Sequence, residues 1–430
     1  MLVDFTISNF RSIRDEQTLS LNVEHARSRL PENFTLIEDG RYAILRSAAI
    51  LGANAAGKSN VVRALAALRW MVIKSDARKD GSSIRPYEPY LLSDAYAAQP
   101  VSMEIEFVVP SGIRYRYSIS YNSSRVVSES LYSFAKRSRA LVFERNSDDT
   151  WMTMKLGGTY KGGTRRFPFF QNAAYLSRAG NDASAPASIR EIYQYFLRLT
   201  YIPAGSRISP GLSVADEAMV QAISELICLA DTGISRLTVE DNEDPGEIRL
   251  PDNLPDSVKE NIIADNKRRA SYWIKAASGE LMEFDEDDMS SGTLRLVELL
   301  PVIMHAFTDG SPVIVDELDA NLHTDIIQLL LKLFHDNQIN KLGAQLIFTT
   351  HDTNVLDPTM LRRDQIWFVS KDDGNSTLKS LDEYERAFVK VDSPFEDFYR
   401  DGRLGALPRL PIGKVRRALL KALASIDEQG

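Results

Sequence analysis

One short segment constrains the fold of this 430-residue chain more than any other. Gly52-Ala-Asn-Ala-Ala-Gly-Lys-Ser59 matches the phosphate-binding pattern G-x-x-x-x-G-K-[ST]. An apolar run at 48–51 precedes it, and apolar residues at helical spacing follow it from about residue 58 to residue 74. Glycines let a backbone fold around an anion with its N–H groups turned inward, and the following helix adds its positive N-terminal end. The segment therefore predicts a buried parallel strand, a phosphate loop and a helix in an α/β fold.

The chemistry of a nucleoside triphosphate assigns tasks within this loop. Lys58 is expected to reach the β- and γ-phosphates, and the Ser59 hydroxyl is expected to ligate Mg²⁺. The other candidates for nucleotide contact are Asn54, Ala55, Ala56, Gly57 and Asn60. ATP and Mg²⁺ are thus the predicted cofactors. The chain contains no motif that reads the base, so the sequence does not distinguish ATP from GTP.

A second feature is the apolar run Val313-Ile-Val315, which ends in Asp316 and Glu317. Asp316 is expected in the Mg²⁺ shell, and Glu317 is expected to orient and deprotonate the attacking water. The alternative is a strand that simply leaves the core through a polar turn. Lys58 and Asp316 are 316 − 58 = 258 residues apart, far more than in small GTPase-like or ring-forming ATPase domains. This spacing indicates a large insertion between two halves of one nucleotide-binding sheet.

A third segment, Ser290-Ser-Gly-Thr293, is called the trans loop below. Its Ser291 lies 316 − 291 = 25 residues before the acidic strand end. The order phosphate loop, S-x-G-type loop, acidic strand end, and strand plus histidine resembles the ABC ATPases, including their SMC and RecF types. The resemblance implies that Ser291, Gly292 and Thr293 of one subunit press on the γ-phosphate held by another. Thr293 departs from the family pattern, in which Gln or Glu is common. The alternative is a plain helix N-cap.

Two further positions extend this resemblance. Asp319, in Leu318-Asp-Ala-Asn321, corresponds to the D-loop that crosses the dimer interface. His351 follows an apolar run at 345–349, as the switch histidine of the family does, and would hydrogen-bond the γ-phosphate and sense its loss. A lone histidine is more often structural, so its assignment as catalytic, beside Lys58 and Glu317, depends on the resemblance.

Motifs along nearly the whole chain carry a narrower resemblance. They are Ile7-Ser-Asn-Phe-Arg-Ser12, Tyr175-Leu-Ser177, Ala230-Asp-Thr-Gly-Ile234, Ser291-Gly-Thr293, Asp316-Glu-Leu-Asp-Ala-Asn-Leu-His323, Thr350-His-Asp-Thr353 and Arg403-Leu-Gly-Ala-Leu-Pro408. Together they resemble the stand-alone prokaryotic AAA/ABC-type ATPases of abortive-infection and other antiphage loci, which are related to the ATPase half of OLD-family nucleases. The resemblance implies that Arg11 lies near the nucleotide and that the partner is a separately encoded toxin or nuclease. Gln171 is the candidate for the family's Q-loop glutamine.

These features predict an ABC-type P-loop head of the α/β class with an antiparallel β meander and an inserted, mostly helical region. The expected divisions are an N-terminal half of the head at 1–100, the β region at 101–185, the helical insertion at 186–280, the C-terminal half of the head at 281–390 and a tail at 391–430. Alternating β-branched and aromatic residues at 101–145 indicate the meander. Pro301 is expected to kink a helix at 292–307, residues 240–258 to form a surface loop, and residues 414–426 to form a basic amphipathic helix.

Composition and charge limit the cellular compartment and the partners that we expect for this protein. The net charge is −8, Cys228 is the single cysteine, and no apolar run approaches the ~18 residues that cross a bilayer. We therefore expect a cytoplasmic protein without membrane contact. No histidine lies at zinc-ligand spacing from the cysteine, so no structural metal site is expected. Basic clusters at 137–139, 165–166 and 267–269 are interpreted as solvated surface, although their convergence on a closed dimer would make nucleic acid a candidate partner. Six acids between Glu280 and Asp288 are interpreted as a solvated face. A sharper hypothesis is that they repel the bound triphosphate and resist closure until Mg²⁺ and a partner are present.

The expected function is an ATP-binding and ATP-hydrolysing switch. A homodimer, or a higher homo-oligomer, closes around ATP and opens on hydrolysis. It would regulate an antiphage system with an effector encoded nearby. The alternative is a DNA repair or maintenance ATPase of the SMC or RecF type. An OLD-like nuclease is less favoured because the tail after the last strand is short for a nuclease domain. A module that binds without hydrolysing is disfavoured by Lys58, Asp316 and Glu317.

Overall fold

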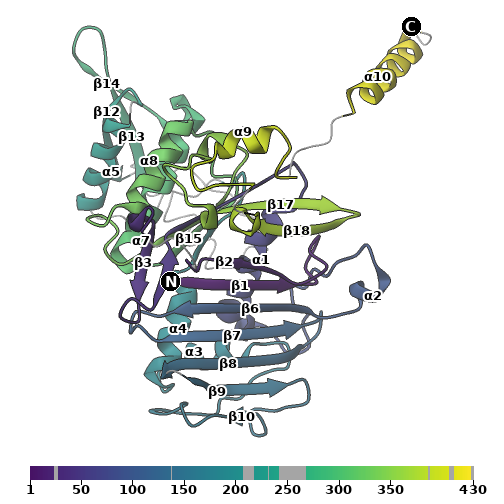
Figure 1. Ribbon diagram of the computed structural model, residues 1–430. Coiled ribbons are helices and arrows are strands. Elements are labelled where there is room, and N and C mark those ends of the chain that lie inside the picture. The colour runs from purple at the N-terminus through teal and green to yellow at the C-terminus, as the bar shows by residue number, and fades with distance from the viewer. Residues whose placement is uncertain are drawn as a thin grey trace.

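The computed structural model describes residues 1–23, 28–136, 138–206, 217–230, 232–241, 268–385, 388–405 and 411–427. Several sequence expectations lie outside these residues: His25, Arg137, Lys267, residues 242–258 of the expected surface loop, and the Ala406-Leu-Pro408 end of one motif. Figure 1 shows an antiparallel sheet in the lower half of the molecule, the parallel strands and their helices above it, and a C-terminal helix that stands apart.

The phosphate loop belongs to a six-stranded sheet with the strand order β11-β15-β16-β5-β17-β18. These strands are β11 (Thr200–Ile202), β15 (Pro312–Val315), β16 (Gln345–Thr349), β5 (Ser47–Gly52), β17 (Ile366–Asp372) and β18 (Asn375–Ser380). The first five are parallel, and β18 returns antiparallel to β17 as a hairpin. Every residue of β5 is buried, as expected of a strand that is covered on both faces.

Helices cover both faces of this parallel sheet. Ala48 and Ile50 lie in the core that contains helix α1 (Lys58–Lys74), and α1 has the bounds that the sequence predicted. Ala49 and Leu51 alternate with them and lie in the core that contains α7 (Ser291–Asp309) and α8 (Thr324–His335). The sheet is therefore sandwiched, and the loop between β5 and α1 emerges at the carboxyl ends of its parallel strands.

The second large sheet is antiparallel and confirms the predicted meander. Its order is β10-β9-β8-β7-β6-β1-β2. The strands are β10 (Lys155–Leu156), β9 (Ser138–Asn146), β8 (Val126–Lys136), β7 (Arg114–Tyr121), β6 (Val101–Val108), β1 (Leu2–Ser8) and β2 (Gln17–Ser20). Every second residue of β7 is buried, and Tyr117 from that set meets Phe196 of helix α4 (Ala187–Arg198) edge to face. One face of the sheet thus packs on helices, as alternation predicts.

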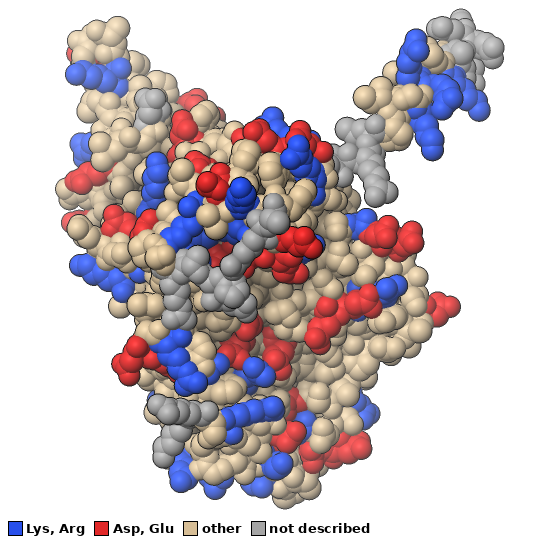
Figure 2. Space-filling view, viewed as in Figure 1, with Lys and Arg blue, Asp and Glu red and all other residues tan. Residues whose placement is uncertain are grey.

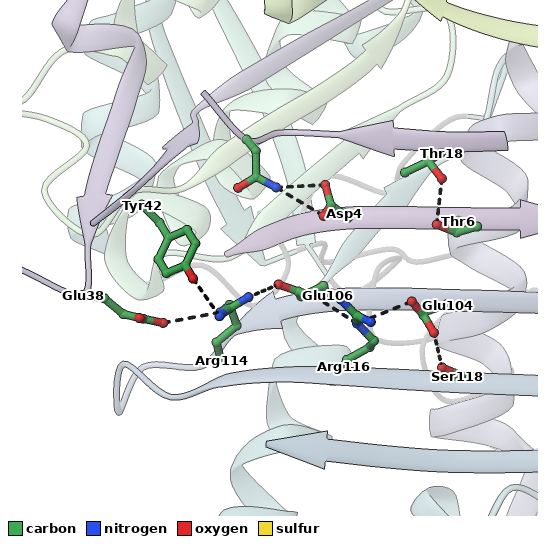
Figure 3. A network of polar contacts seen from close by, with 11 residues as sticks. Asp4, Thr6, Thr18, Glu38, Tyr42, Glu104, Glu106, Arg114, Arg116 and Ser118 are labelled. Atoms are coloured by element: carbon green, nitrogen blue, oxygen red, sulfur yellow. Dashed lines mark hydrogen bonds and ion pairs between the residues drawn. The ribbon is translucent and has the colours of Figure 1, made fainter. Parts of the chain in front are cut away.

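The other face of the antiparallel sheet is polar, and its charged side chains pair with one another (Figure 3). Arg116 donates to Glu106 at 2.8 and 3.0 Å, and Arg114 pairs with the same carboxylate. Arg114 also donates to the Tyr42 hydroxyl at 3.2 Å, and Tyr42 belongs to a separate hairpin. That hairpin consists of β3 (Phe34–Ile37) and β4 (Tyr42–Leu45). The network therefore fastens the hairpin to the sheet.

The insertion contains strands as well as helices among its described residues. Besides α4 and α5 (Glu217–Leu229), it holds β12 (Ile234–Asp241) and β13 (Arg268–Lys275), which form a three-stranded antiparallel sheet with β14 (Leu281–Phe284). Ile227 of α5 and Leu237 of β12 share a core with α7. We did not anticipate these strands, because they are rich in charged residues and lack a regular apolar–polar alternation.

Two helices bear on function. Helix α7 continues through Pro301 without ending there, and the kink expected at that residue stays a prediction. Helix α10 (Ile412–Asp427) projects from the body (Figure 1), and each of its side chains from Ile412 to Leu423 is exposed. None of the described helices combines the length and apolar character needed to cross a membrane.

Candidate functional site

The phosphate loop is shaped by close backbone contacts and by Lys58. A Cβ atom on Gly52 would lie 2.3 Å from the Val369 carbonyl oxygen of β17, so only glycine fits at the end of β5. Lys58 folds back over the loop, and its Nζ donates to the Gly52 carbonyl at 2.9 Å and to the Ala53 carbonyl at 3.3 Å. Burial lowers the pKa of Lys58, while the carboxylates of Asp319, Glu317 and Asp316 act to raise it.

Thr349 links the Asp316 carboxylate to the backbone of Glu317 at the end of β15. Its hydroxyl donates to Asp316 Oδ1 at 2.7 Å and accepts from the Glu317 backbone N–H at 2.7 Å. Asp316 is fully buried, and its Oδ2 has no hydrogen-bond partner among the described residues. Glu317 has a φ of 55°, so the chain turns sharply after Asp316. Thr349 was not among the residues predicted for the site, although its position at the end of the adjacent strand β16 could have suggested it.

His351 lies between the phosphate loop and the segment that follows Glu317. Its Nδ1 is 3.5 Å from Lys58 Nζ, and its backbone N–H donates to Asp319 Oδ2 at 3.1 Å. The pKa of His351 is lowered, first by burial and then by the Lys58 charge, so the ring is neutral at pH 7. Lys58, His351 and Asp319 are thus brought together from three segments that are distant in sequence.

The trans loop opens helix α7. The Ser290 side chain caps this helix by accepting from the Thr293 backbone N–H at 3.1 Å, and the two hydroxyl oxygens are 2.8 Å apart. Ser290 is therefore the N-cap of α7, whereas Ser291 beside it is exposed and does not cap the helix. A Cβ atom on Gly292 would lie 2.5 Å from the Asn321 carbonyl oxygen. The trans loop consequently packs against the 318–321 segment of the same chain.

Arg11 is held by Glu88, a partner that the sequence analysis missed. Arg11 Nε donates to Glu88 Oε2 at 2.6 Å, Nη2 donates to Oε1 at 2.8 Å, and the Arg11 backbone N–H donates to the Glu88 carbonyl at 2.8 Å. The hydrogen bond to Glu88 raises the pKa of Arg11. The next residue, Ser12, accepts from Asn60 Nδ2 at 2.6 Å. Arg11 is therefore fixed by Glu88, and the neighbouring Ser12 contacts the first turn of α1.

Gln171 does not lie at this site. Its side-chain amide donates to the Asp149 carbonyl, and the neighbouring Asn172 donates to the Lys79 and Ser82 carbonyls, beyond the C-terminal end of α1. The phosphate loop opens the opposite end of α1, and a 17-residue helix is about 25 Å long. The assignment of Gln171 as a Q-loop residue is therefore wrong, because the antiparallel sheet carries it to the far end of α1.

The charged clusters are largely engaged within the chain. Arg165 and Arg166 donate to backbone carbonyls of Gly157, Trp151 and Met152. Arg269 pairs with Asp285 from the acidic run, and Asp285 and Asp288 cap a short helical turn just before the trans loop. Among the described residues, no cluster of three or more His, Cys, Asp or Glu is placed to hold a metal by itself.

The chain matches one protein-family model over most of its length. Residues 47–357 match a family model described as "AAA domain, putative AbiEii toxin, Type IV TA system". None of the curated proteins compared with the chain matches it.

Three solved structures are similar over most of the chain at low identity. The SMC head domain from Thermotoga maritima is 13% identical, with 88% of this chain and 98% of that chain covered and a TM-score of 0.41. An SMC head bound to the C-winged helix domain of ScpA is 15% identical, with 90% and 99% covered and a TM-score of 0.42. The ATP-bound recombination mediator RecF is 12% identical, with 88% and 99% covered and a TM-score of 0.37. We infer nothing about the site from similarities this low.

Proposed function

We propose that this chain, which belongs to the AAA-domain family whose model matches residues 47–357, binds ATP and hydrolyses it between two copies of itself. The observation that carries the proposal is the meeting of three strand ends. The phosphate loop follows β5, Asp316 and Glu317 follow β15, and His351 follows β16, which lies between the other two strands in the sheet. Nucleotides bind beyond the carboxyl ends of strands in open parallel sheets.

The residues at this edge suit a magnesium ion. Asp316 Oδ2 is buried without a partner among the described residues, and a buried carboxylate oxygen needs a donor or a cation. We assign Asp316 and the Ser59 hydroxyl as the protein ligands, because Mg²⁺ is usually held by one or two side chains together with phosphate oxygens and water. When bound, the ion would neutralise charge on the β- and γ-phosphates. Asn54, Ala55, Ala56, Gly57 and Asn60 would complete the nucleotide contacts.

Glu317 and His351 are the proposed catalytic pair beside Lys58. Glu317 would orient the attacking water, and its backbone is already fixed by the Thr349 hydroxyl. His351 is neutral, because burial and Lys58 lower its pKa, so it offers one donor and one acceptor nitrogen to the γ-phosphate and the water. Asp319 holds the backbone of His351 and would report the state of this histidine to the dimer interface.

Closure is proposed to place the trans loop of one copy on the nucleotide of the other. Ser291 is exposed at the N-terminal end of the 19-residue helix α7, where backbone N–H groups and the helix dipole favour an anion. Gly292 packs against Asn321, so a shift of the D-loop would move the trans loop of the same subunit. This arrangement supports the proposal of a homodimer that closes on ATP and opens on hydrolysis.

The biological use that we propose is regulation of an antiphage system through a separately encoded effector. The family description reads "putative AbiEii toxin, Type IV TA system", which supports a toxin–antitoxin setting and names no separate effector. Helix α10 offers a docking element: it exposes apolar residues at helical spacing, and cationic side chains gather on it (Figure 2). The large exposed apolar residues are Ile412, Val415, Leu419, Leu420 and Leu423, and the cations are Lys414, Arg416, Arg417 and Lys421. An acidic effector surface with an apolar groove would complement this helix.

The test is purification of the Glu317→Gln protein together with the products of neighbouring genes, with mass measured with and without ATP and Mg²⁺. This substitution should slow hydrolysis and leave ATP binding intact, so an ATP-dependent assembly should persist. A complex that contains a second protein, and loses it when residues 412–430 are removed, supports the effector proposal. A homodimer that captures DNA in a salt-sensitive manner would replace it with the DNA repair alternative.

The matched control is Lys58→Ala, which should not bind ATP and should show the same mass with and without nucleotide. If Glu317→Gln and Lys58→Ala behave alike, and neither binds ATP, the ATPase proposal itself is overturned. If both dimerise equally without nucleotide, the ATP-driven closure is overturned while nucleotide binding is not.

A further inference from the structure

The β17–β18 hairpin meets the phosphate loop through one side chain, Ser376. The Ser376 hydroxyl donates to the Ala56 carbonyl at 2.5 Å and lies 2.7 Å from the Ser12 hydroxyl oxygen. Ser376 is 1% exposed, so water does not compete for these bonds. Ser376 comes from the antiparallel edge strand of the sheet, 320 residues beyond Ala56 in the chain. No pattern around the phosphate loop points to it.

We propose that Ser376 is a positioning residue for the phosphate loop, and that it aims the Gly57 N–H at the bound phosphate. In a trans peptide the carbonyl and the N–H lie in one plane and point in opposite directions, and the chain has no cis peptide bond among its described residues. Holding the Ala56 carbonyl toward the hairpin therefore turns the Gly57 N–H away from it. That is the side on which a phosphate is held by inward N–H groups. The proposal rests on the proposed nucleotide binding and goes beyond it.

Gly57 lies directly beside the hydroxyls of Ser376 and Ser12, which together are called the clamp. Its φ of 111° lies in the region that favours glycine. A Cβ atom at Gly57 would lie 2.3 Å from the Ser376 hydroxyl oxygen and 2.8 Å from that of Ser12. The two hydroxyls therefore occupy the space that any other residue would need. The second glycine of the motif is required here by the hairpin as well as by the turn of the loop itself.

The same hairpin holds the N-terminal loop that carries Arg11. The Ser376 backbone N–H donates to the Ser12 carbonyl at 2.7 Å, and the Arg14 backbone N–H donates to Asn375 Oδ1 at 3.0 Å. Asn375 Nδ2 also donates to Asp15 Oδ2 at 3.0 Å. The phosphate loop and the Arg11 loop are thus hydrogen-bonded to one element, the β17–β18 hairpin.

The test compares ATP affinity in Ser376→Ala, Ser376→Thr and Thr377→Ala. Ser376→Ala should bind ATP about tenfold more weakly, as expected for the loss of one buried hydrogen bond that orients a phosphate donor. Ser376→Thr keeps the hydroxyl and should recover most of the affinity. Thr377→Ala is the matched control, because Thr377 is the next residue of β18, is exposed, and bonds only to Ser370 in the described chain. Affinity for adenosine, which lacks phosphate, should be the same in all three variants.

A purely structural role for Ser376 would lower the unliganded melting temperature and weaken ATP and adenosine alike. Equal ATP affinity in Ser376→Ala and the unmodified protein would also overturn the proposal. Should Ser376→Ala fail to fold, Ser12→Ala removes the second hydroxyl of the clamp and should weaken ATP binding in the same direction. If the unmodified protein does not bind ATP, the proposed function fails first, so the two failures are distinguishable.

Discussion

Two buried residues illustrate how single side chains set the properties of the site and of the core. Thr349 ends β16 directly beside the acidic end of β15 and shares one oxygen between Asp316 and the backbone of Glu317. A valine would fill the same space and supply neither bond. The orientation of the Asp316 carboxylate and of the Glu317 backbone therefore depends on a hydroxyl from a neighbouring strand.

His335 predicts how stability responds to acid. It is buried beside Ser47, whose hydroxyl oxygen is 2.9 Å from His335 Nε2, and burial followed by the Arg46 charge lowers its pKa to about 3. The unfolded chain, with a histidine pKa near 6.5, binds the proton that the folded chain refuses. Stability is therefore fully present above pH ~6.5 and is lost as pH falls toward 3. Between pH 7.5 and 5.5 this residue should account for a loss of about 1.4 kcal/mol.

The measurement is the free energy of unfolding in urea at these two pH values. His335→Gln removes the titrating ring and should shrink the difference between the two pH values by that amount, whatever its own stability. His305→Gln alters an exposed histidine and should leave the difference as it is in the unmodified protein. An unchanged pH difference in His335→Gln would show that the imidazole is not buried as a neutral group.

At the scale of elements, one buried ion pair joins the antiparallel sheet to helix α3 (Tyr175–Gly180). Arg145 of β9 donates to Glu129 of β8 at 2.8 Å, and both side chains are at most 1% exposed. Glu129 also accepts from the backbone N–H groups of Tyr175 at 2.7 Å and Leu176 at 3.0 Å. A single carboxylate therefore neutralises an arginine and caps the start of a helix.

Glu129→Gln should destabilise the protein by about 3–5 kcal/mol, because it leaves the buried Arg145 charge without a counter-ion. Glu144→Gln on β9 is the control: it removes an exposed pair with Lys155 and should cost below about 1 kcal/mol. Urea midpoints of the three proteins give the comparison. Adding Arg145→Met to Glu129→Gln should restore part of the loss, and similar midpoints for both single variants would contradict the buried-pair interpretation.

At the scale of the whole molecule, the proposed dimer predicts that two inactive variants complement each other. Lys58→Ala should lose its own nucleotide, and Ser291→Arg should block the trans loop. In a mixed dimer, the intact Lys58 of one copy meets the intact Ser291 of the other, so one of two sites is complete. Half of the dimers in an equal mixture are mixed, and ATPase activity should therefore return to about a quarter of the unmodified level. A mixture no more active than its parts would mean that each copy works alone.

The sequence by itself determined the local chemistry. The phosphate loop, α1, β5 and the acidic end of β15 were predicted because each is encoded by contiguous residues whose spacing matches one element. The meander at 101–145 was recognisable for the same reason. The division into five segments, the dimer and the effector stay predictions, since they concern boundaries and partners rather than local pattern.

Only the tertiary structure decided which distant side chains serve the site. Ser376, Thr349 and Glu88 come from separate segments and act through hydrogen bonds to residues distant in the chain, which leave no periodic trace in a sequence. Gln171 was misassigned because nothing in its local sequence states which end of α1 the sheet approaches. The strands of the insertion were missed because their burial comes from α5 and α7 rather than from an alternation of their own. Local pattern fixes an element through its own residues, whereas the neighbours of that element are fixed by packing between segments far apart in the chain.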